Sequence, residues 1–86
     1  MYYVYVLQSK KNKKWYTGYT SDLQKRFREH NDGRNKYTKG RGPFVLIYYE
    51  AYKEGDDARS REGQLKSGPG KAYLRRRIKH FLALSG

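Results

Sequence analysis

The chain has 86 residues, enough for one small domain with a single modest core. Twenty Lys and Arg against eight Asp and Glu give a formal net charge of +12, which favours contact with nucleic acid, the commonest biological polyanion. The sequence contains no Cys, so disulfides, thiolate metal sites and cysteine nucleophiles are excluded.

The aliphatic content is low, but ten Tyr, three Phe and one Trp can supply a core through their large buried areas. No stretch approaches the roughly 20 apolar residues of a membrane span. The first residues lack the basic start and long apolar run of a signal peptide. We therefore expect a soluble cytoplasmic protein that does not contact a membrane.

The N-terminal residues predict a β-hairpin. Tyr2–Leu7 and Trp15–Tyr19 are rich in aromatic and β-branched residues, and the polar segment Ser9–Lys14 between them is typical of a turn. Alternation divides the first strand into two faces, one with Tyr3, Tyr5 and Leu7 and the other with Val4 and Val6.

A helix and a basic loop are expected to follow the hairpin. Short oxygen side chains at Thr20–Asp22 are typical of a helix N-cap. Leu23 and Phe27, four residues apart, would form the buried stripe of a helix that ends near Asn31. The Gly-containing, basic segment Asp32–Pro43 predicts a loop.

The second half of the chain predicts one more strand and two more helices. The nearly continuous apolar run Phe44–Tyr49 indicates a central strand that is covered on both faces. Asp56 and Asp57 would begin a helix that stops in the helix-breaking run Ser67–Gly70, and Leu74 begins the apolar stripe of a final helix. The order β-β-α-β-α-α predicts one α+β domain over residues 1–86, with a largely antiparallel three-stranded sheet packed against three helices.

Glu62 lies where an apolar residue would be expected. It shares one helix face with Ala58 and Leu65, and a carboxylate near a core is costly unless it meets a cation or a metal ion. A salt bridge to Arg59, Lys66 or another basic residue would satisfy it equally well. On the residues alone both interpretations stay open.

Polar groups near the hairpin are also candidates for a site. Arg26 and His30 are four residues apart on one helix face, although His30 could equally be a capping or surface histidine. Tyr5 and Tyr16 would lie on adjacent strands, and taken singly each is more often a core residue. Gly18 could allow a backbone turn or the close approach of a phosphate.

Taken in order, these segments resemble the GIY-YIG endonuclease superfamily. Tyr3-Val4-Tyr5 and Tyr16-Thr17-Gly18 resemble its paired signature, although Tyr and Thr replace the usual Gly and Ile. Tyr19–Asn31 resembles the helix that carries the family's Arg, and Ala58–Lys66 its metal-binding Glu helix. The resemblance covers roughly residues 2 to 78. The chain looks like the short stand-alone bacterial members, which are similar in catalytic core to the excision-repair nuclease subunit.

The resemblance implies roles for five residues. Glu62 would be the one protein ligand of a single Mg²⁺ or Mn²⁺ ion, which would polarise the scissile phosphate. Tyr5 would act as the general base or orient the attacking water, and Tyr16 would hold a phosphate oxygen or help to activate that water. Arg26 would neutralise charge in the transition state, and His30 would assist proton transfer. Because the free pKa of a phenol is about 10, nearby cations would have to favour the phenolate.

Further residues are expected to contact nucleic acid. Gly18 could let a phosphate approach closely, and Tyr19 stands where some relatives of the family have a Lys or another polar residue. The basic loop and final helix would provide phosphate contacts. The basic residues are Arg34, Lys36, Lys39, Arg41, Arg75 and Arg76. Many relatives carry an Asn in the final helix region, whereas this chain has none beyond Asn35.

The sequence thus predicts a metal-dependent endonuclease that acts in repair or recombination without sequence specificity, with DNA favoured over RNA as its partner. No element suited to reading base edges is evident. Two alternatives stay open: a weak or inactive DNA- or RNA-binding member of the family, and a basic ribosome-associated protein. The sequence does not indicate an oligomeric state.

Overall fold

The computed structural model describes residues 1–85, and Gly86, the last residue of the expected domain, lies outside the described residues. The predicted α+β class and element order are confirmed, except that the expected final helix is divided in two. The elements in chain order are β1 (Tyr2–Ser9), β2 (Trp15–Thr20), α1 (Leu23–Asn31), β3 (Phe44–Tyr52), α2 (Gly55–Lys66), α3 (Gly68–Arg77) and α4 (Lys79–Ser85).

The sheet has the strand order β2-β1-β3, and both pairs are antiparallel. The prediction of a central strand at Phe44–Tyr49 is therefore wrong, because β3 is an edge strand in which Tyr49 is 54% exposed. The central strand is β1, whose residues Val4 to Leu7 are all buried. The apolar run of β3 reflects helices that pack on both faces of the sheet and leave its residues 45–48 partly buried at the edge.

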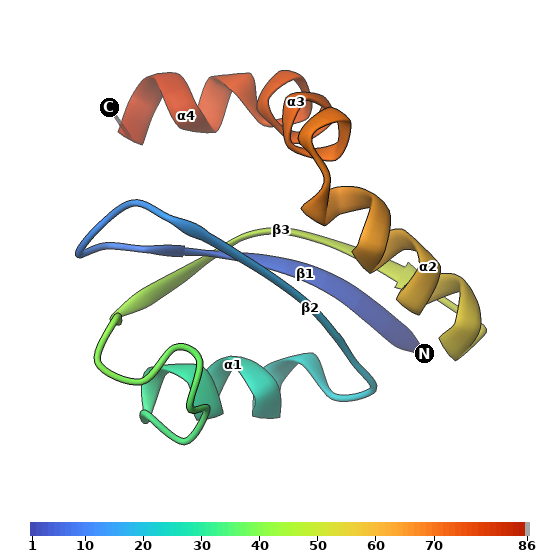
Figure 1. The fold of residues 1–86 in the computed structure, drawn as a ribbon, viewed down its shortest axis with the longest axis horizontal. Helices are drawn as coiled ribbons and strands as arrows, with labels where there is room; N and C mark the ends of the chain where they lie inside the picture. Colours follow the sequence, from blue (N-terminus) through green and yellow to red (C-terminus); the bar gives the residue numbers. More distant parts are fainter. Residues whose placement is uncertain (86) are drawn as a thin grey trace.

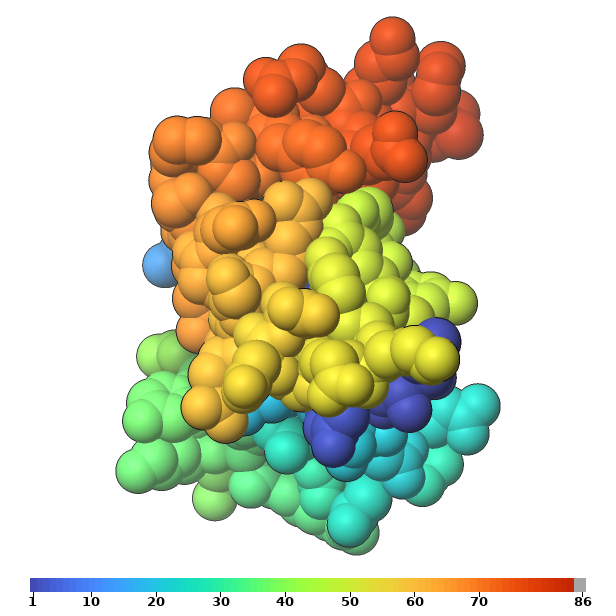
Figure 2. All heavy atoms as spheres, turned by 90° about the vertical axis from the view of Figure 1, so that its right-hand side faces the viewer, coloured from blue at the N-terminus to red at the C-terminus, as the bar shows by residue number. Residues whose placement is uncertain are grey.

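Helices cover the two faces of the sheet (Figure 1). On one side α1 packs through Phe27 against Tyr5 and Leu7 of β1. On the other side, α2 and α3 pack against the face that carries Val4 and Val6. The predicted division of β1 into two faces is confirmed, and Figure 2 shows the resulting tiers, with α1 and its loop at the bottom and α3 and α4 at the top.

Local signals explain most helix ends. The Asp22 side chain accepts a hydrogen bond from the Lys25 amide at 3.1 Å, which caps α1 as expected. The helix-breaking run at Ser67–Gly70 ends α2, but it also begins α3, because Ser67 Oγ accepts from the Gly70 amide at 3.1 Å and Pro69 occupies the first turn. None of the helices within residues 1–85 is long and apolar enough to cross a bilayer.

A polar cluster fastens α2 to β3. Arg61 of α2 donates from Nε and Nη2 to the two carboxylate oxygens of Glu50 on β3, at 2.9 and 3.1 Å. The hydroxyls of Tyr48 and Tyr52 donate to the same carboxylate. Burial raises the pKa of Glu50, but the hydrogen bonds from Arg61, Tyr48 and Tyr52 outweigh it and hold that pKa below its usual value. Because Glu62 is next to Arg61, this contact fixes the helix that carries the candidate metal ligand.

Candidate active site

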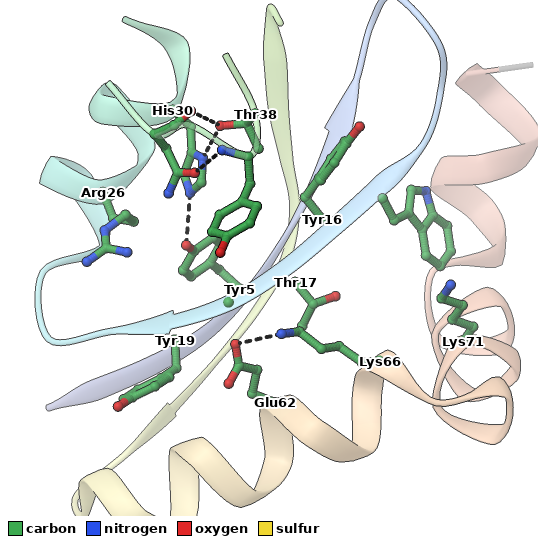
Figure 3. A pocket seen from close by; sticks show the side chains of 14 residues that line it. Tyr5, Tyr16, Thr17, Tyr19, Arg26, His30, Thr38, Glu62, Lys66 and Lys71 are labelled. Carbon is green, nitrogen blue, oxygen red and sulfur yellow. Dashed lines mark hydrogen bonds and ion pairs between the residues drawn. The ribbon is translucent and has the colours of Figure 1, made fainter. Parts of the chain in front are cut away.

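A cleft of about 640 Å³ opens between α1 with its following loop and α2, across β2 (Figure 3). The side chains that sequence analysis assigned to catalysis come from four different elements, and all of them line this cleft. They are Tyr5, Tyr16, Arg26, His30 and Glu62. Gly18 and Tyr19, expected to contact nucleic acid, line it as well. The fold therefore brings the candidate residues together around one solvent-accessible space.

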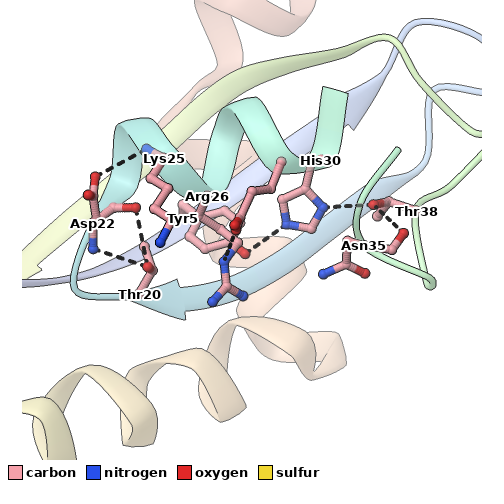
Figure 4. A network of polar contacts seen from close by, with 9 residues as sticks. Tyr5, Thr20, Asp22, Lys25, Arg26, His30, Asn35 and Thr38 are labelled. Carbon is pink, nitrogen blue, oxygen red and sulfur yellow. Dashed lines mark hydrogen bonds and ion pairs between the residues drawn. The ribbon is translucent and has the colours of Figure 1, made fainter. Parts of the chain in front are cut away.

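A chain of hydrogen bonds runs from Tyr5 into the wall of the cleft (Figure 4). Tyr5 Oη lies 3.0 Å from His30 Nε2, and His30 Nδ1 lies 2.7 Å from Thr38 Oγ1. The Thr38 hydroxyl also lies 3.5 Å from the carbonyl oxygen of Asn35. Tyr5, His30 and Thr38 are 4%, 6% and 2% exposed, so these hydrogen bonds are shielded from water except at the cleft.

Burial determines the protonation states of the Tyr5 hydroxyl and the His30 ring. Burial raises the pKa of Tyr5 above the ordinary phenol value, and the neighbouring Arg26 guanidinium offsets only part of that rise. Burial also lowers the pKa of His30, and the positive charge of Arg26 lowers it further. At neutral pH the resting cleft therefore holds a phenol and a neutral imidazole. The cations expected to favour a phenolate do not outweigh burial.

Gly18 lies against the ring of Tyr5. The two residues are paired in the β1–β2 register, and a Cβ at position 18 would lie 2.7 Å from Tyr5 Cζ. No real side chain tolerates that distance, so the ring can lie across β2 only because residue 18 is glycine. The close approach anticipated at Gly18 is thus made by a phenol of the chain itself.

Arg26 and Glu62 face the cleft from opposite walls, and each has an acidic or basic neighbour. Arg26 Nε lies 3.3 Å from Glu29 Oε1, and Glu62 Oε2 lies 3.2 Å from Lys66 Nζ. The salt bridge that the sequence left open for Glu62 is therefore present. The Glu62 side chain is 19% exposed, whereas that of Lys66 is 56% exposed, so the partner is held from the solvent side.

The remaining tyrosines occupy the rim. The ring of Tyr16 packs edge-on against Phe44 at a centroid distance of 5.4 Å, and in Figure 3 its hydroxyl points away from Glu62. Tyr19 lies on the other side, where its hydroxyl accepts from Arg59 Nε and Nη2 at 3.1 and 2.7 Å. Tyr16 is thus less directly engaged with the buried hydrogen-bond chain than Tyr5.

The basic residues expected to contact nucleic acid divide into three groups. Those of the loop, Arg34, Lys36, Lys39 and Arg41, are exposed outside the cleft wall. Arg75 of α3 lines a second, neighbouring cleft, and Arg76 is exposed outside both clefts. The loop residues that do line the main cleft are uncharged ones, Asn35, Tyr37 and Thr38.

The side chains around the cleft fit a site in which one hard cation is bound by few protein ligands. Within residues 1–85, no three His, Asp or Glu side chains gather in a metal-binding group. Glu62 is the single carboxylate among the described residues that line the cleft, and a metal ion bound there would compete with the Lys66 ammonium for it. Mg²⁺ is often bound in this way, through one or two carboxylates with waters and substrate phosphate completing its coordination.

Sequence reasoning missed several cleft residues. Thr38 is the buried partner of His30, yet it was treated only as part of a basic loop, and no local pattern marks it. Lys66, one helical turn after Glu62, is by contrast one of the salt-bridge partners that the sequence offered for that carboxylate. Trp15 and Lys71 line the cleft near its far end, where β2 meets α3.

Comparisons with known proteins agree with this architecture. The family model described as the GIY-YIG catalytic domain matches residues 1–73. The UPF0213 protein CPE1444 of Clostridium perfringens is 46% identical over 67 residues, which cover 77% of this chain and 71% of that protein. The UPF0213 protein BH0048 of Halalkalibacterium halodurans is 37% identical over 86 residues, covering 99% of this chain and 85% of that protein.

A solved structure is also similar. The solution NMR structure of the UPF0213 protein BH0048 from Bacillus halodurans has a TM-score of 0.53 and 41% sequence identity, and the match covers 86% of this chain and 82% of that chain. The names of these relatives state no activity.

Proposed function

Because the chain belongs to the GIY-YIG family of nuclease catalytic domains, we propose that it is a divalent-metal-dependent endonuclease that hydrolyses phosphodiester bonds in DNA. The observation that carries the proposal is the convergence of Tyr5, Arg26, His30 and Glu62 on one cleft. A general acid-base pair, a phosphate-binding cation and a carboxylate for a metal are the groups that such a hydrolysis requires.

The hydrogen-bond chain supports a coupled proton transfer. Tyr5 Oη takes a proton from the attacking water while its own proton moves to His30 Nε2. The water oxygen then forms a bond to phosphorus as the bond to the leaving sugar oxygen breaks. Because the pKa of Tyr5 is raised, a free phenolate would be unfavourable, and moving both protons together avoids it.

Thr38 orients this transfer. If its hydroxyl proton is directed to the Asn35 carbonyl, its oxygen accepts from His30 Nδ1–H, and Nε2 of the neutral ring is free to accept from Tyr5. Arg26 contributes positive charge for the phosphate oxygens. Mg²⁺ or Mn²⁺ bound at Glu62 would supply Lewis acidity to the phosphate and to the departing oxygen.

The experiment is a cleavage panel. The purified protein is incubated with branched, flapped, nicked, single-stranded and duplex DNA, and with the corresponding RNA, in Mg²⁺, Mn²⁺ or EDTA. We expect metal-dependent cutting of at least one DNA, loss of cutting in EDTA and weaker cutting of RNA. Arg26→Ala should abolish cutting, whereas Arg28→Ala on the same helix, outside the cleft, should not. Equal cutting by both variants, or undiminished cutting in EDTA, would reject the proposal.

A second candidate is a family member that binds nucleic acid without cutting it. The ion pair between Glu62 and Lys66 favours it, because a carboxylate satisfied by an ammonium needs no metal. The same set of substrates separates the nuclease from the binding protein. A protein that only binds would shift these substrates in a mobility-shift assay and cut none of them. The convergence of the other cleft residues favours the enzyme.

A further inference from the structure

A second cleft, of about 520 Å³, adjoins the candidate active site and is strongly basic. It lies between the β1–β2 turn and the C-terminal helices α3 and α4. Four of its six lining residues are cationic: Lys13, Lys14, Lys71 and Arg75, with Trp15 and Leu82 completing the wall. None of these four cations forms an ion pair with a carboxylate of residues 1–85. Their charge is therefore available to an external anion.

The two clefts are neighbours that share part of their lining. Trp15 and Lys71 line both of them, so a strand that crosses the candidate active site can run on into the basic cleft without leaving the surface. In Figure 3, Lys71 extends from the α3 side, well beyond Tyr16 and Glu62. A ligand spanning both clefts would thus have one part near Glu62 and a neighbouring part near Trp15.

Trp15 gives the basic cleft an aromatic surface. The indole is half-buried and packs against the core that contains Val4 and Leu65, which anchors it. The Arg75 guanidinium lies over the indole ring, 5.9 Å from its centroid, so a stacked base would take its place or share that face with it. A fixed indole beside cations is the arrangement that binds unpaired bases, because stacking needs a free base face and the phosphates need positive charge.

The turn that presents Lys13 and Lys14 is held in place. Ser9 is fully buried, its Oγ donates to the Arg41 carbonyl at 2.6 Å, and it accepts from the Lys11 and Asn12 amides at 3.1 and 3.2 Å. Lys13 adopts a φ of 64°, which residues other than glycine rarely do. The turn is therefore a defined wall of the basic cleft.

We propose that this basic cleft is a subsite for unpaired nucleotides of the strand that is cut, with a base stacked on Trp15 and its phosphates bound by Lys14 and Lys71. The inference rests on the proposed nuclease function and adds a substrate class, nucleic acid with a single-stranded segment next to the cleaved bond. A fully paired duplex hides its base faces and cannot stack on the indole.

Trp15 is the only tryptophan of the chain, so its fluorescence reports directly on the subsite. In EDTA, which prevents metal-dependent cutting, the protein is titrated with a single-stranded oligonucleotide, a flapped duplex and a blunt duplex. Binding is followed independently by the anisotropy of a dye on the DNA. We expect the single strand and the flap to change the tryptophan emission, and the blunt duplex to bind with little change.

Variants test the two parts of the subsite separately. Trp15→Leu, which keeps an apolar core contact, should weaken single-strand binding about tenfold, whereas Trp15→Phe should retain most of it. Lys14→Ala with Lys71→Ala should lower the salt slope of single-strand binding by about 1.4, at roughly 0.7 per phosphate contact. Lys53→Ala, an exposed control just after β3, should leave that slope unchanged. Circular dichroism establishes that each variant is folded.

Several results would overturn the proposal. One is binding of single-stranded DNA without a change in tryptophan emission, and another is equal affinity of the Trp15→Leu and Trp15→Phe variants for that DNA. A salt slope that the double lysine variant leaves unchanged would also overturn it. So would an equal emission change with polyglutamate, a polyanion without bases. The outcome is distinguishable from failure of the nuclease proposal. Cutting without a role for Trp15 rejects only the subsite, whereas stacking on Trp15 without cutting rejects only the nuclease.

Discussion

Tyr5 is held by two direct contacts, and a third contact holds one of its two partners. Gly18 leaves room for its ring, His30 binds its hydroxyl, and Thr38 binds the far side of His30. Because two of these contacts join segments far apart in the sequence, the position of one phenol depends on β1, β2, α1 and the loop after α1. Small changes at any of them should affect the proposed chemistry.

Gly18→Ala tests the close approach. A methyl group there would displace the Tyr5 ring, so we expect a loss of about 1–3 kcal/mol in the free energy of unfolding, together with loss of cleavage. Gly63→Ala is the matched control, because a Cβ there meets nothing within 4 Å and lies in helix α2. It should raise stability by about 0.5–1 kcal/mol. Urea denaturation measures both, and equal effects would contradict the account.

The burial of His30 predicts a pH effect on stability. Burial and Arg26 lower its pKa in the folded state, so below about pH 6.5 the unfolded chain binds a proton that the folded chain does not. The free energy of unfolding should therefore fall as the pH drops through this range. His30→Gln should flatten that part of the profile, whereas His80→Gln, outside the cleft, should not. Parallel profiles for wild type and His30→Gln would refute the prediction.

The residues that chemistry marks strongly could be predicted from the sequence, and those marked only by tertiary contact could not. Glu62 was noticeable as a carboxylate on an apolar helix face. Thr38 was not, because its role depends on a loop folding back on His30, and an isolated Thr among basic residues carries no such signal. The close packing of the Tyr5 ring over Gly18 could not be predicted either, because it depends on the register that pairs these two residues.

For the strands and helices, periodicity predicted their positions along the sequence well and their arrangement in space less well. The hairpin, the N-cap at Asp22 and the two faces of β1 follow from local chemistry. The order of strands does not, since an apolar run indicates burial but not which neighbour provides it, and β3 proved to be an edge. The break at Ile78 between α3 and α4 lies inside an apolar stripe that continues through it.

The contact between Glu50 and Arg61 should be the main polar tie between β3 and α2. Arg61→Met would leave the Glu50 carboxylate with only hydroxyl partners. We expect a loss of about 2 kcal/mol in the free energy of unfolding, less than for a fully buried pair because both side chains keep some exposure. In a double-mutant cycle with Glu50→Gln, the combined variant should be more stable than the sum of the single effects. Additive effects would show that the tie contributes nothing.

Over the whole molecule, whose net charge is +12, the two clefts differ in how charged residues are combined. The main cleft combines one carboxylate with several cations, whereas the neighbouring basic cleft has cations around an indole. The first arrangement suits chemistry on a phosphate and the second suits retention of a strand. The charge alone favoured nucleic acid as a partner, but it did not distinguish these two tasks, which depend on how the chain folds.

The proposed hydrolysis requires that Glu62 holds the metal ion needed for cutting. The most direct measurement is the rate of cleavage of a flapped DNA in Mg²⁺ by wild type, Glu62→Gln and Glu54→Gln, the last of which removes the same charge from an exposed position at the start of α2. We predict similar rates for wild type and Glu54→Gln, and a rate at least about 100-fold lower for Glu62→Gln. Cleavage by Glu62→Gln at the wild-type rate would show that the Glu62 carboxylate does not hold the ion.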